Sequence, residues 1–347
     1  MSITINNKEI GADGRTYIVA ELSANHNQSL ERALRIIAAA GEAGADAVKV
    51  QTYTPDTLTV DCPNECFRIK GTVWEGRNLY DLYKEAFTPW EWHPQLQDAC
   101  NRLGLDFFST PFDATAVDFL EDMQVPAHKV ASFELVDIPL LRKIARTGKP
   151  VIMSTGMATS AEIDEAVRTI REAGGGEIAL LKCASAYPAA PEEMNLKTMA
   201  HLSQTYGVPV GLSDHSLGSA AAVASVALGG CIIEKHLTLS RGDGGADSAF
   251  STEPAEFRAL VDDIRVVEKA LGSVTYEITD KQKENRAFRR SLFVVKDVEQ
   301  GAPFTEENVR SIRPGDGMHT RNLDQVLGRK AARDITKGTP LSWDMIG

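Results

Sequence analysis

The sequence predicts a (β/α)8 barrel followed by a small, mostly β domain. Short β-rich apolar runs alternate with amphipathic helical stretches from residue 17 to residue 272, and there are eight such runs. The alternation then stops, and short strands with turn signals follow. Strands that alternate with helices form right-handed βαβ units and a parallel sheet. Eight units over roughly 250 residues is the typical length of a closed barrel.

Each apolar run precedes a polar loop. The runs are YIVAEL (17–22), AVKVQ (47–51), DFFST (106–110), HKVAS (128–132), VIMST (151–155), IALLKC (178–183), VGLS (210–213) and IIEKH (232–236). Between them, stretches such as LERALRIIAAAGEAG and SAEIDEAVRTIREAG repeat apolar residues at i, i+3, i+4 and i+7, and several end in glycine. A doubly wound open sheet is the alternative. Against it, SANHNQS and not a glycine-rich phosphate-binding turn follows the first strand.

Two segments depart from the repeat. The connection over residues 53–89 is polar, carries aromatic residues and is far longer than an ordinary loop. Such a long connection is predicted to cover or shape a functional site. The alternatives are a surface insertion and an oligomer contact. Near the other end, residues 279–290 are strongly charged and have the character of a linker. We therefore place the barrel at 1–272, the linker at 273–289 and the β domain at 290–347. A domain as small as the last one has little hydrophobic core of its own.

Charge and composition exclude several classes of function. The 37 Lys and Arg against 48 Asp and Glu give a net charge of −11, which argues against a nucleic-acid or membrane-surface partner. An anionic substrate then needs a locally positive pocket. The N-terminus lacks the pattern of a signal peptide, and no window has the ~20 apolar residues of a membrane span, so we expect a cytoplasmic protein. Five cysteines, an odd number, argue against a disulfide framework.

Polar side chains occupy all eight predicted strand ends, where barrel enzymes place their chemistry. They are Glu21; Lys49 and Gln51; Ser109 and Thr110; Lys129, Ser132 and Glu134; Ser154 and Thr155; Lys182 and Ser185; Ser213 and His215; and Glu234 and His236. Alternate residues of a strand share a face, so pairs two residues apart are predicted to point into one mouth. These pairs are Lys49 with Gln51, Ser213 with His215 and Glu234 with His236.

His215 and His236 are predicted to hold a divalent metal ion. They end the seventh and eighth runs, which are neighbours in a closed barrel, so their imidazoles can converge. Two imidazoles with carboxylate or substrate oxygens suit Mn²⁺, Mg²⁺ or a similar ion, and the three protein ligands of catalytic zinc are not present in this pattern. The alternative is that each histidine belongs to a buried hydrogen-bond network. Cys62 and Cys66 lack the second ligand pair of a zinc finger.

The lysines and hydroxyls at the strand ends predict an anion pocket. Ammonium and hydroxyl donors suit phosphate and carboxylate oxygens, and burying lysines without an anion is costly. Structural ion pairs with Glu21, Glu134 or Glu234 are the alternative. The donors are Lys49, Lys129, Lys182, Thr110, Ser132, Ser154, Ser185 and Ser213.

Motifs along nearly the whole chain carry a resemblance to a known family. They include AELSANHNQS, GADAVKVQTY, FFSTPFD, HKVASFE, VIMSTGMA, LLKCASAYPA, GLSDHS, IIEKH and SIRPGDG, in that order. They resemble the sialic acid synthase family of nonulosonic acid synthases. The resemblance implies condensation of phosphoenolpyruvate (PEP) with an open-chain acetamido sugar, assisted by Mn²⁺, Mg²⁺ or Co²⁺. It also implies a C-terminal antifreeze-like (SAF) domain, swapped in a homodimer so that one arginine reaches the partner's active site.

The resemblance also implies roles for individual residues. His215 and His236 match the metal ligands. Glu21 matches a carboxylate near the reacting carbon, and we expect it to position or deprotonate water. PEP-binding positions match Lys49, Thr110, Lys129, Ser132, Ser154, Ser185 and Ser213. Acceptor-side positions match the carboxylates Glu134 and Asp247, the aromatic Tyr187, and Arg313 as the swapped arginine.

Three motifs bear on the acceptor that the resemblance implies. NHNQS, YKEAFTPWEW and GGADSAFS resemble the branch of the family whose acceptor is 2,4-diacetamido-2,4,6-trideoxy-L-altrose. Ser185 stands where neuraminate synthases carry Asn, and GGAD at 244–247 replaces their GPD. Two alternatives stay open: the same chemistry with N-acetylmannosamine or the legionaminic acid precursor, and a non-catalytic barrel that binds sugar or phosphate.

Overall fold

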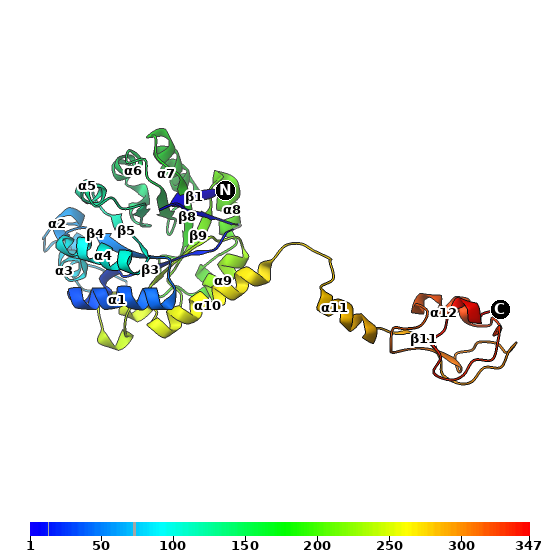
Figure 1. Ribbon diagram of the computed structural model, residues 1–347. Coiled ribbons are helices and arrows are strands. Elements are labelled where there is room, and N and C mark those ends of the chain that lie inside the picture. Colours follow the sequence, from blue (N-terminus) through cyan, green and yellow to red (C-terminus); the bar gives the residue numbers. More distant parts are fainter. Residues whose placement is uncertain (13, 72–73) are drawn as a thin grey trace. The chain divides into compact units, whose positions relative to one another are not determined.

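The computed structural model describes residues 1–12, 14–71 and 74–347, which divide into two compact units, Met1–Gly272 and Ser273–Gly347. The first unit is a closed barrel of parallel strands surrounded by helices, which confirms the predicted fold class (Figure 1). The last strand pairs with the first, with Ile232 opposite Tyr17. Its strands are β3 (Tyr17–Glu21), β4 (Ala47–Thr52), β5 (Asp106–Pro111), β6 (His128–Val130), β7 (Val151–Ser154), β8 (Ile178–Cys183), β9 (Val210–Asp214) and β10 (Ile232–His236).

The helices begin and end where the local sequence provides caps. The Ser29 side chain accepts a hydrogen bond from the Arg32 N–H and begins α1, and Gly44 ends that helix at a φ of 87°. Thr159 and Glu162 form a capping box at α7. The helices of the first unit are α1 (Leu30–Ala43), α2 (Pro55–Leu58), α3 (Leu79–Ala86), α4 (His93–Arg102), α5 (Ala114–Asp122), α6 (Ile138–Ala145), α7 (Ser160–Glu172), α8 (Thr198–Tyr206), α9 (Ala220–Ala227) and α10 (Pro254–Leu271).

An N-terminal hairpin, which the strand pattern did not predict, precedes the barrel. It consists of β1 (Ser2–Ile5) and β2 (Lys8–Gly11). The Asn6 amide and the Lys8 ammonium each donate to the Asp106 carboxylate at 2.8 Å, and the Tyr17 hydroxyl also donates to it at 2.8 Å. Asp106 begins β5, so the hairpin is attached at the N-terminal ends of the strands, opposite the edge where barrel enzymes place their chemistry.

The long connection after β4 contains α2 and α3, and its residues 72 and 73 lie outside the described residues. The Gln28 amide ties it to the first barrel loop by donating to the carbonyls of Glu85 and Phe87 at 2.9 and 2.7 Å. The Trp90 indole N–H donates to the Tyr53 carbonyl at 3.1 Å. These contacts hold the connection against the edge of the barrel where the strands end.

The second unit has its own small core, in which Leu292, Val294, Phe304 and Val309 are buried. Its strands β11 (Ser291–Val294) and β12 (Val309–Ile312) pair antiparallel, and α12 (Leu323–Val326) follows. The charged segment predicted to be a linker contains a short exposed helix, α11 (Asp280–Asn285), which Thr279 caps.

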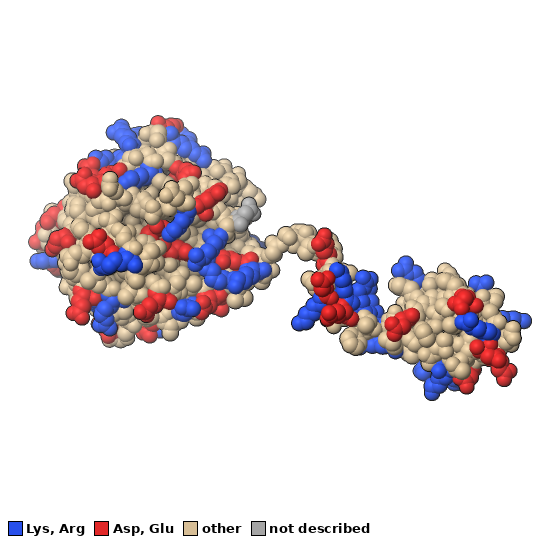
Figure 2. Space-filling model, viewed as in Figure 1, with Lys and Arg blue, Asp and Glu red and all other residues tan. Residues whose placement is uncertain are grey.

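The surface carries charges of both signs. On the face of the first unit that Figure 2 presents, Lys and Arg are interspersed with Asp and Glu. Among the described helices, none combines the length and apolar character needed to cross a membrane.

Candidate active site

A cavity of about 370 Å³ lies at the C-terminal ends of the barrel strands. Each of the eight strands contributes a lining side chain from its last residues or from the loop that follows, as the polar strand ends predicted. The lining residues from these positions include Ser23, Lys49, Gln51, Thr110, Lys129, Ser132, Ser154, Cys183, Ser213, His215, Glu234 and His236. The size falls within the usual range for a small-molecule site.

Four buried charged groups lie at the bottom of the cavity; Lys49, Lys129 and Glu234 line it, and Glu21 contacts Lys49. The Lys49 Nζ lies 2.6 Å from Glu21 Oε2 and 3.8 Å from Glu234 Oε1, and the Lys129 Nζ lies 4.0 Å from the same Glu234 oxygen. None of the four residues is more than 5% exposed. We call Glu21, Lys49, Lys129 and Glu234 the charged floor. Its two positive groups are balanced by its two negative groups. The ion pairs hold the lysines in place before an anion enters the cavity.

Hydroxyl groups surround these lysines. The Lys129 ammonium donates to Ser154 Oγ at 2.6 Å and to the Val130 carbonyl at 2.9 Å. Thr110 Oγ1 accepts from Lys49 at 3.2 Å, and Ser213 donates to Glu234 Oε1 at 3.2 Å. Ammonium and hydroxyl donors are therefore gathered in one buried region, which is the donor set that phosphate and carboxylate oxygens require.

Burial and mutual attraction shift the ionisation of the charged floor. Burial raises the pKa of Glu21 to about 7, while Lys49 opposes that rise and Glu234 adds to it. Burial lowers the pKa of Lys129. Burial acts to raise the pKa of Glu234, but the nearby lysines and His215 hold that pKa below its ordinary value. Glu21 is thus the group of the floor most able to exchange a proton near neutral pH.

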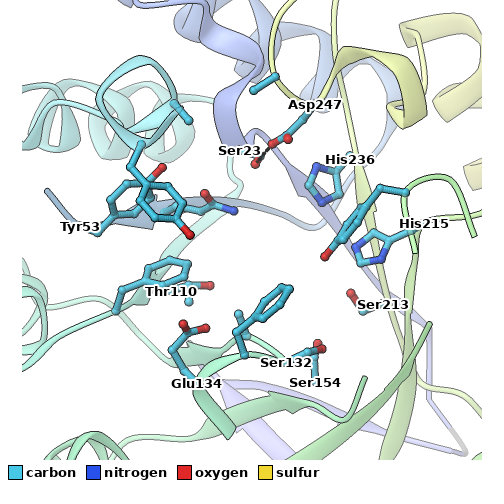
Figure 3. Close-up of a pocket in the computed structure, with 18 of the residues that line it drawn as sticks. Ser23, Tyr53, Thr110, Ser132, Glu134, Ser154, Ser213, His215, His236 and Asp247 are labelled. Atoms are coloured by element: carbon cyan, nitrogen blue, oxygen red, sulfur yellow. Dashed lines mark hydrogen bonds between the residues drawn. The ribbon is translucent and has the colours of Figure 1, made fainter. Parts of the chain in front are cut away.

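His215 and His236 lie beside one another, with ring centroids 5.3 Å apart (Figure 3). His215 Nδ1 lies 3.1 Å from the Ala184 carbonyl and donates to it, so Nε2 is the ring nitrogen that could bind a metal ion. Burial acts to lower the pKa of His215, but the contacts with Cys183 and the Ala184 carbonyl raise it above the ordinary value. The Nδ1 of His236 is buried without a hydrogen-bond partner among the described residues. Burial lowers the pKa of His236 well below its ordinary value, so the ring stays neutral, the form that binds metals.

These two histidines fit a divalent cation that keeps several positions for water or substrate. Among the residues that the structure describes, no group of three or more His, Cys, Asp or Glu side chains is arranged to hold a metal. A site at His215 and His236 therefore needs oxygen ligands from water or substrate to complete it. Mn²⁺ and Co²⁺ accept such mixed nitrogen and oxygen coordination, whereas Mg²⁺ prefers oxygen ligands.

Two carboxylates and an aromatic ring line the cavity above the floor. Glu134 follows β6; its Oε2 is buried with no hydrogen-bond partner among the described residues, and burial raises its pKa to about 7. Asp247 accepts a hydrogen bond from the Ser23 hydroxyl, and burial raises its pKa. The Tyr187 ring lies 4.5 Å from that of His215. Figure 3 shows Glu134 and Asp247 on different sides of the same space.

Three residues of the first unit that were predicted for the site, Glu21, Ser185 and Lys182, do not line the cavity. Glu21 lies behind Lys49, and Ser185 Oγ lies beside the Cys183 thiol at 3.8 Å. The side chain of Lys182 points away from the cavity because Cys183, the next residue of β8, faces inward. The Lys182 ammonium donates to the Cys183 carbonyl at 2.7 Å. Its assignment to the anion pocket was wrong. Arg313 is exposed at the end of β12 in the second unit, and its role in a partner's site stays a prediction.

Sequence reasoning missed Cys183 and Tyr53, both of which line the cavity. The Cys183 Sγ lies 3.7 Å from His215 Nδ1. Burial acts to raise the pKa of its thiol, but His215, Ser132 and Lys129 lower it to about 7. Strand alternation along β8 would have found Cys183, because it points inward where Lys182 points outward.

Comparison with known proteins covers both units. The NeuB family matches residues 36–276, and the SAF domain matches residues 289–347. A pseudaminic acid synthase of Campylobacter jejuni is 46% identical over 329 residues, covering 95% of this chain and 96% of its own. The pseudaminic acid synthase of Helicobacter pylori is 44% identical over 330 residues, covering 95% of this chain and 97% of its own. The crystal structure of an N-acetylneuraminic acid synthetase from Leptospira borgpetersenii in complex with citrate is 32% identical, with a TM-score of 0.73, and the match covers 82% of this chain and 95% of that one.

Proposed function

This chain belongs to the NeuB family, and from that premise we propose that it is a pseudaminic acid synthase. It would condense PEP with 2,4-diacetamido-2,4,6-trideoxy-L-altrose to give pseudaminic acid and phosphate. The observation that carries the proposal is the identity of 44 to 46% with two pseudaminic acid synthases over 95% of the chain. The charged floor and the histidine pair supply groups suited to that reaction.

PEP would bind with its phosphate and carboxylate against the charged floor. Lys49 and Lys129 provide the positive charges, and Thr110, Ser154 and Ser213 lie within hydrogen-bond distance of members of the floor. Ser132 and Ser185 lie beside this region: the Gly156 N–H donates to Ser132 at 3.1 Å, and a side chain on Gly156 would overlap Ser185. Holding both anionic groups orients the PEP methylene carbon, and orientation alone can contribute several kcal/mol to catalysis.

The carbon–carbon bond would form between C3 of PEP and the aldehyde carbon of the open-chain sugar. A divalent cation held by His215 and His236 would supply Lewis-acid polarisation of the aldehyde oxygen. Attack leaves positive charge at C2 of PEP, which the Glu234 carboxylate, a residue that lines the cavity, would favour electrostatically. Water then adds at C2, loses a proton, and the bond between C2 and the phosphate oxygen breaks.

Glu21 would influence the water step through Lys49. Its carboxylate lies 2.6 Å from the Lys49 ammonium and does not itself line the cavity. A pKa of about 7 lets the Glu21 and Lys49 pair take up a proton near neutral pH and keeps the charge of the floor close to balanced when PEP enters. Glu21 would thus be a positioning residue for the reaction.

The acceptor would lie above PEP, between Glu134, Asp247 and Tyr187. The carboxylates suit sugar hydroxyl and amide N–H donors, and the Tyr187 ring provides an apolar contact beside His215. Arg313 would add a bidentate donor from the partner subunit in a swapped homodimer. We also propose that the enzyme works in the cytoplasm, where PEP is available.

The test is phosphate release from PEP with Mn²⁺ present and three acceptors in parallel: the diacetamido L-altrose sugar, N-acetylmannosamine and the legionaminic acid precursor. Turnover with the L-altrose sugar alone supports the proposal. Turnover with another acceptor alone would keep the chemistry and overturn the substrate. No turnover with any acceptor, despite PEP binding measured by calorimetry, would favour a non-catalytic binding barrel.

A further inference from the structure

The cavity has two chemically different sides. The charged floor and the histidines occupy one side, whereas the connection after β4 contributes side chains that are mainly apolar. We call the following six lining residues the apolar wall: Tyr53, Leu58, Leu79, Leu82 and Tyr83 from this connection, and Phe112 directly after β5. Tyr53 is 2% exposed and anchors the wall, with its ring 5.8 Å from that of Tyr83 and 5.1 Å from that of Phe112.

Helix α3 presents this wall by its sequence pattern. Leu79, Leu82 and Tyr83 lie at i, i+3 and i+4 and face the cavity, while Asp81 and Lys84 do not line it. Among the described residues of the connection over 53–89, no charged side chain lines the cavity. A substrate edge in contact with Leu58, Leu79 and Leu82 therefore loses its hydration without gaining an ionic partner from this connection, which favours methyl groups over hydroxyl groups at that edge.

The direction of the acceptor follows from the position of the reacting groups. Figure 3 shows Tyr53 across the cavity from His215 and His236. The aldehyde carbon C1 must lie at the histidine side, next to PEP, because the new bond forms there. C6 is the opposite end of the open-chain sugar, and it then extends toward the side of the cavity where Tyr53 stands.

On this basis we infer that the apolar wall is the subsite for the C6 methyl end of the acceptor, and that it selects 6-deoxy sugars over their 6-hydroxy analogues. This inference rests on the proposed function and names the feature of the chain that sets its acceptor class. The discrimination expected of an apolar subsite against an added hydroxyl group is about 10- to 100-fold in kcat/KM.

The experiment measures kcat/KM with the 6-deoxy diacetamido L-altrose sugar and with its 6-hydroxy analogue, at saturating PEP and Mn²⁺. Leu79→Asn places an amide of similar size in the wall. We expect it to reduce the preference for the 6-deoxy sugar about 10-fold and to leave the KM for PEP unchanged. Leu79→Met, which stays apolar, is expected to retain the preference. Lys84→Gln, on the outer side of the same helix, is the matched control and leaves both rates unchanged.

Circular dichroism shows whether Leu79→Asn folds. Even if it does not, the ratio of the two kcat/KM values in the wild-type protein still tests the inference. Turnover of both sugars by the wild-type protein at similar kcat/KM would overturn the apolar wall as a selective subsite while leaving the proposed function intact. An unchanged ratio in a folded Leu79→Asn variant would overturn it as well. Absence of turnover with either sugar would instead overturn the proposed function, and this inference with it.

Discussion

Replacing Glu134 with Gln separates the role of its charge from its role in packing. The Glu134 carboxylate lines the cavity above the charged floor, and its Oε2 is buried with no hydrogen-bond partner among the described residues. Burial raises its pKa from 4.5 to about 7. The free protein therefore bears a cost for ionising this group, and a sugar donor would offset that cost on binding.

The sign and size of the effect on stability follow from that pKa. Below pH 4.5 the carboxyl is protonated in both the folded and the unfolded chain, so it costs nothing. As pH rises from 4.5 through about 7 the unfolded chain ionises first, and the wild-type protein loses stability. At about 1.4 kcal/mol per pH unit, the full effect amounts to ~3 kcal/mol. Glu134→Gln escapes this loss, so its stability relative to wild type should rise by roughly 2 to 3 kcal/mol between pH 5 and pH 8.

Two assays check this reasoning. Urea unfolding at pH 5 and pH 8 measures the stability difference, with the exposed Glu192→Gln as control. Steady-state kinetics should give a KM for the acceptor raised 10- to 100-fold in Glu134→Gln, the range expected for a lost hydrogen bond to a charged group, with the KM for PEP unchanged. In wild type the KM for the acceptor should fall as pH rises through about 7.

A stability difference that is the same at both pH values would refute the burial argument. A KM for PEP that rises together with that for the acceptor would refute the placement of Glu134 on the acceptor side.

Three further predictions concern the rest of the site. His236→Ala should abolish metal-dependent turnover and weaken Mn²⁺ binding measured by calorimetry while the fold is retained; turnover near the wild-type rate would contradict the metal assignment. Lys235→Met should destabilise the barrel by about 3 to 5 kcal/mol in urea unfolding, because it leaves the buried Asp214 carboxylate, 2.7 Å away, without its cation. A cost below 1 kcal/mol would show that other donors suffice. Gly156→Ala should raise the KM for PEP at least 10-fold, because the new methyl group overlaps the Ser185 hydroxyl; an unchanged KM would place PEP elsewhere.

Periodicity was sufficient to predict the barrel and the strand ends that meet at its mouth. Lys49, Lys129, His215 and His236 converge because a closed parallel barrel brings all its C-terminal strand ends to one edge. The alternation rule correctly paired Ser213 with His215 on one face.

Other features depended on contacts between distant segments. The contact of Glu21 with Lys49, which lines the cavity while Glu21 does not, was not predicted, and the role of Glu21 near the reacting carbon stays a prediction. The N-terminal hairpin is held by Asp106, a hundred residues away from Asn6, and no local pattern reveals such a contact. The apolar wall was also missed, because the connection over 53–89 is polar on average and its apolar residues that face the cavity, such as Leu79, Leu82 and Tyr83 of α3, form no continuous apolar run.

The reaction product provides the most direct test of the proposed function. Purified protein, PEP, Mn²⁺ and the diacetamido L-altrose sugar would be incubated, and the mixture analysed by mass spectrometry together with a phosphate assay. The account predicts a nonulosonic acid one pyruvate unit heavier than the sugar, formed in equal amount with phosphate. Phosphate without that product, or the product only when N-acetylmannosamine or the legionaminic acid precursor replaces the sugar, would contradict it.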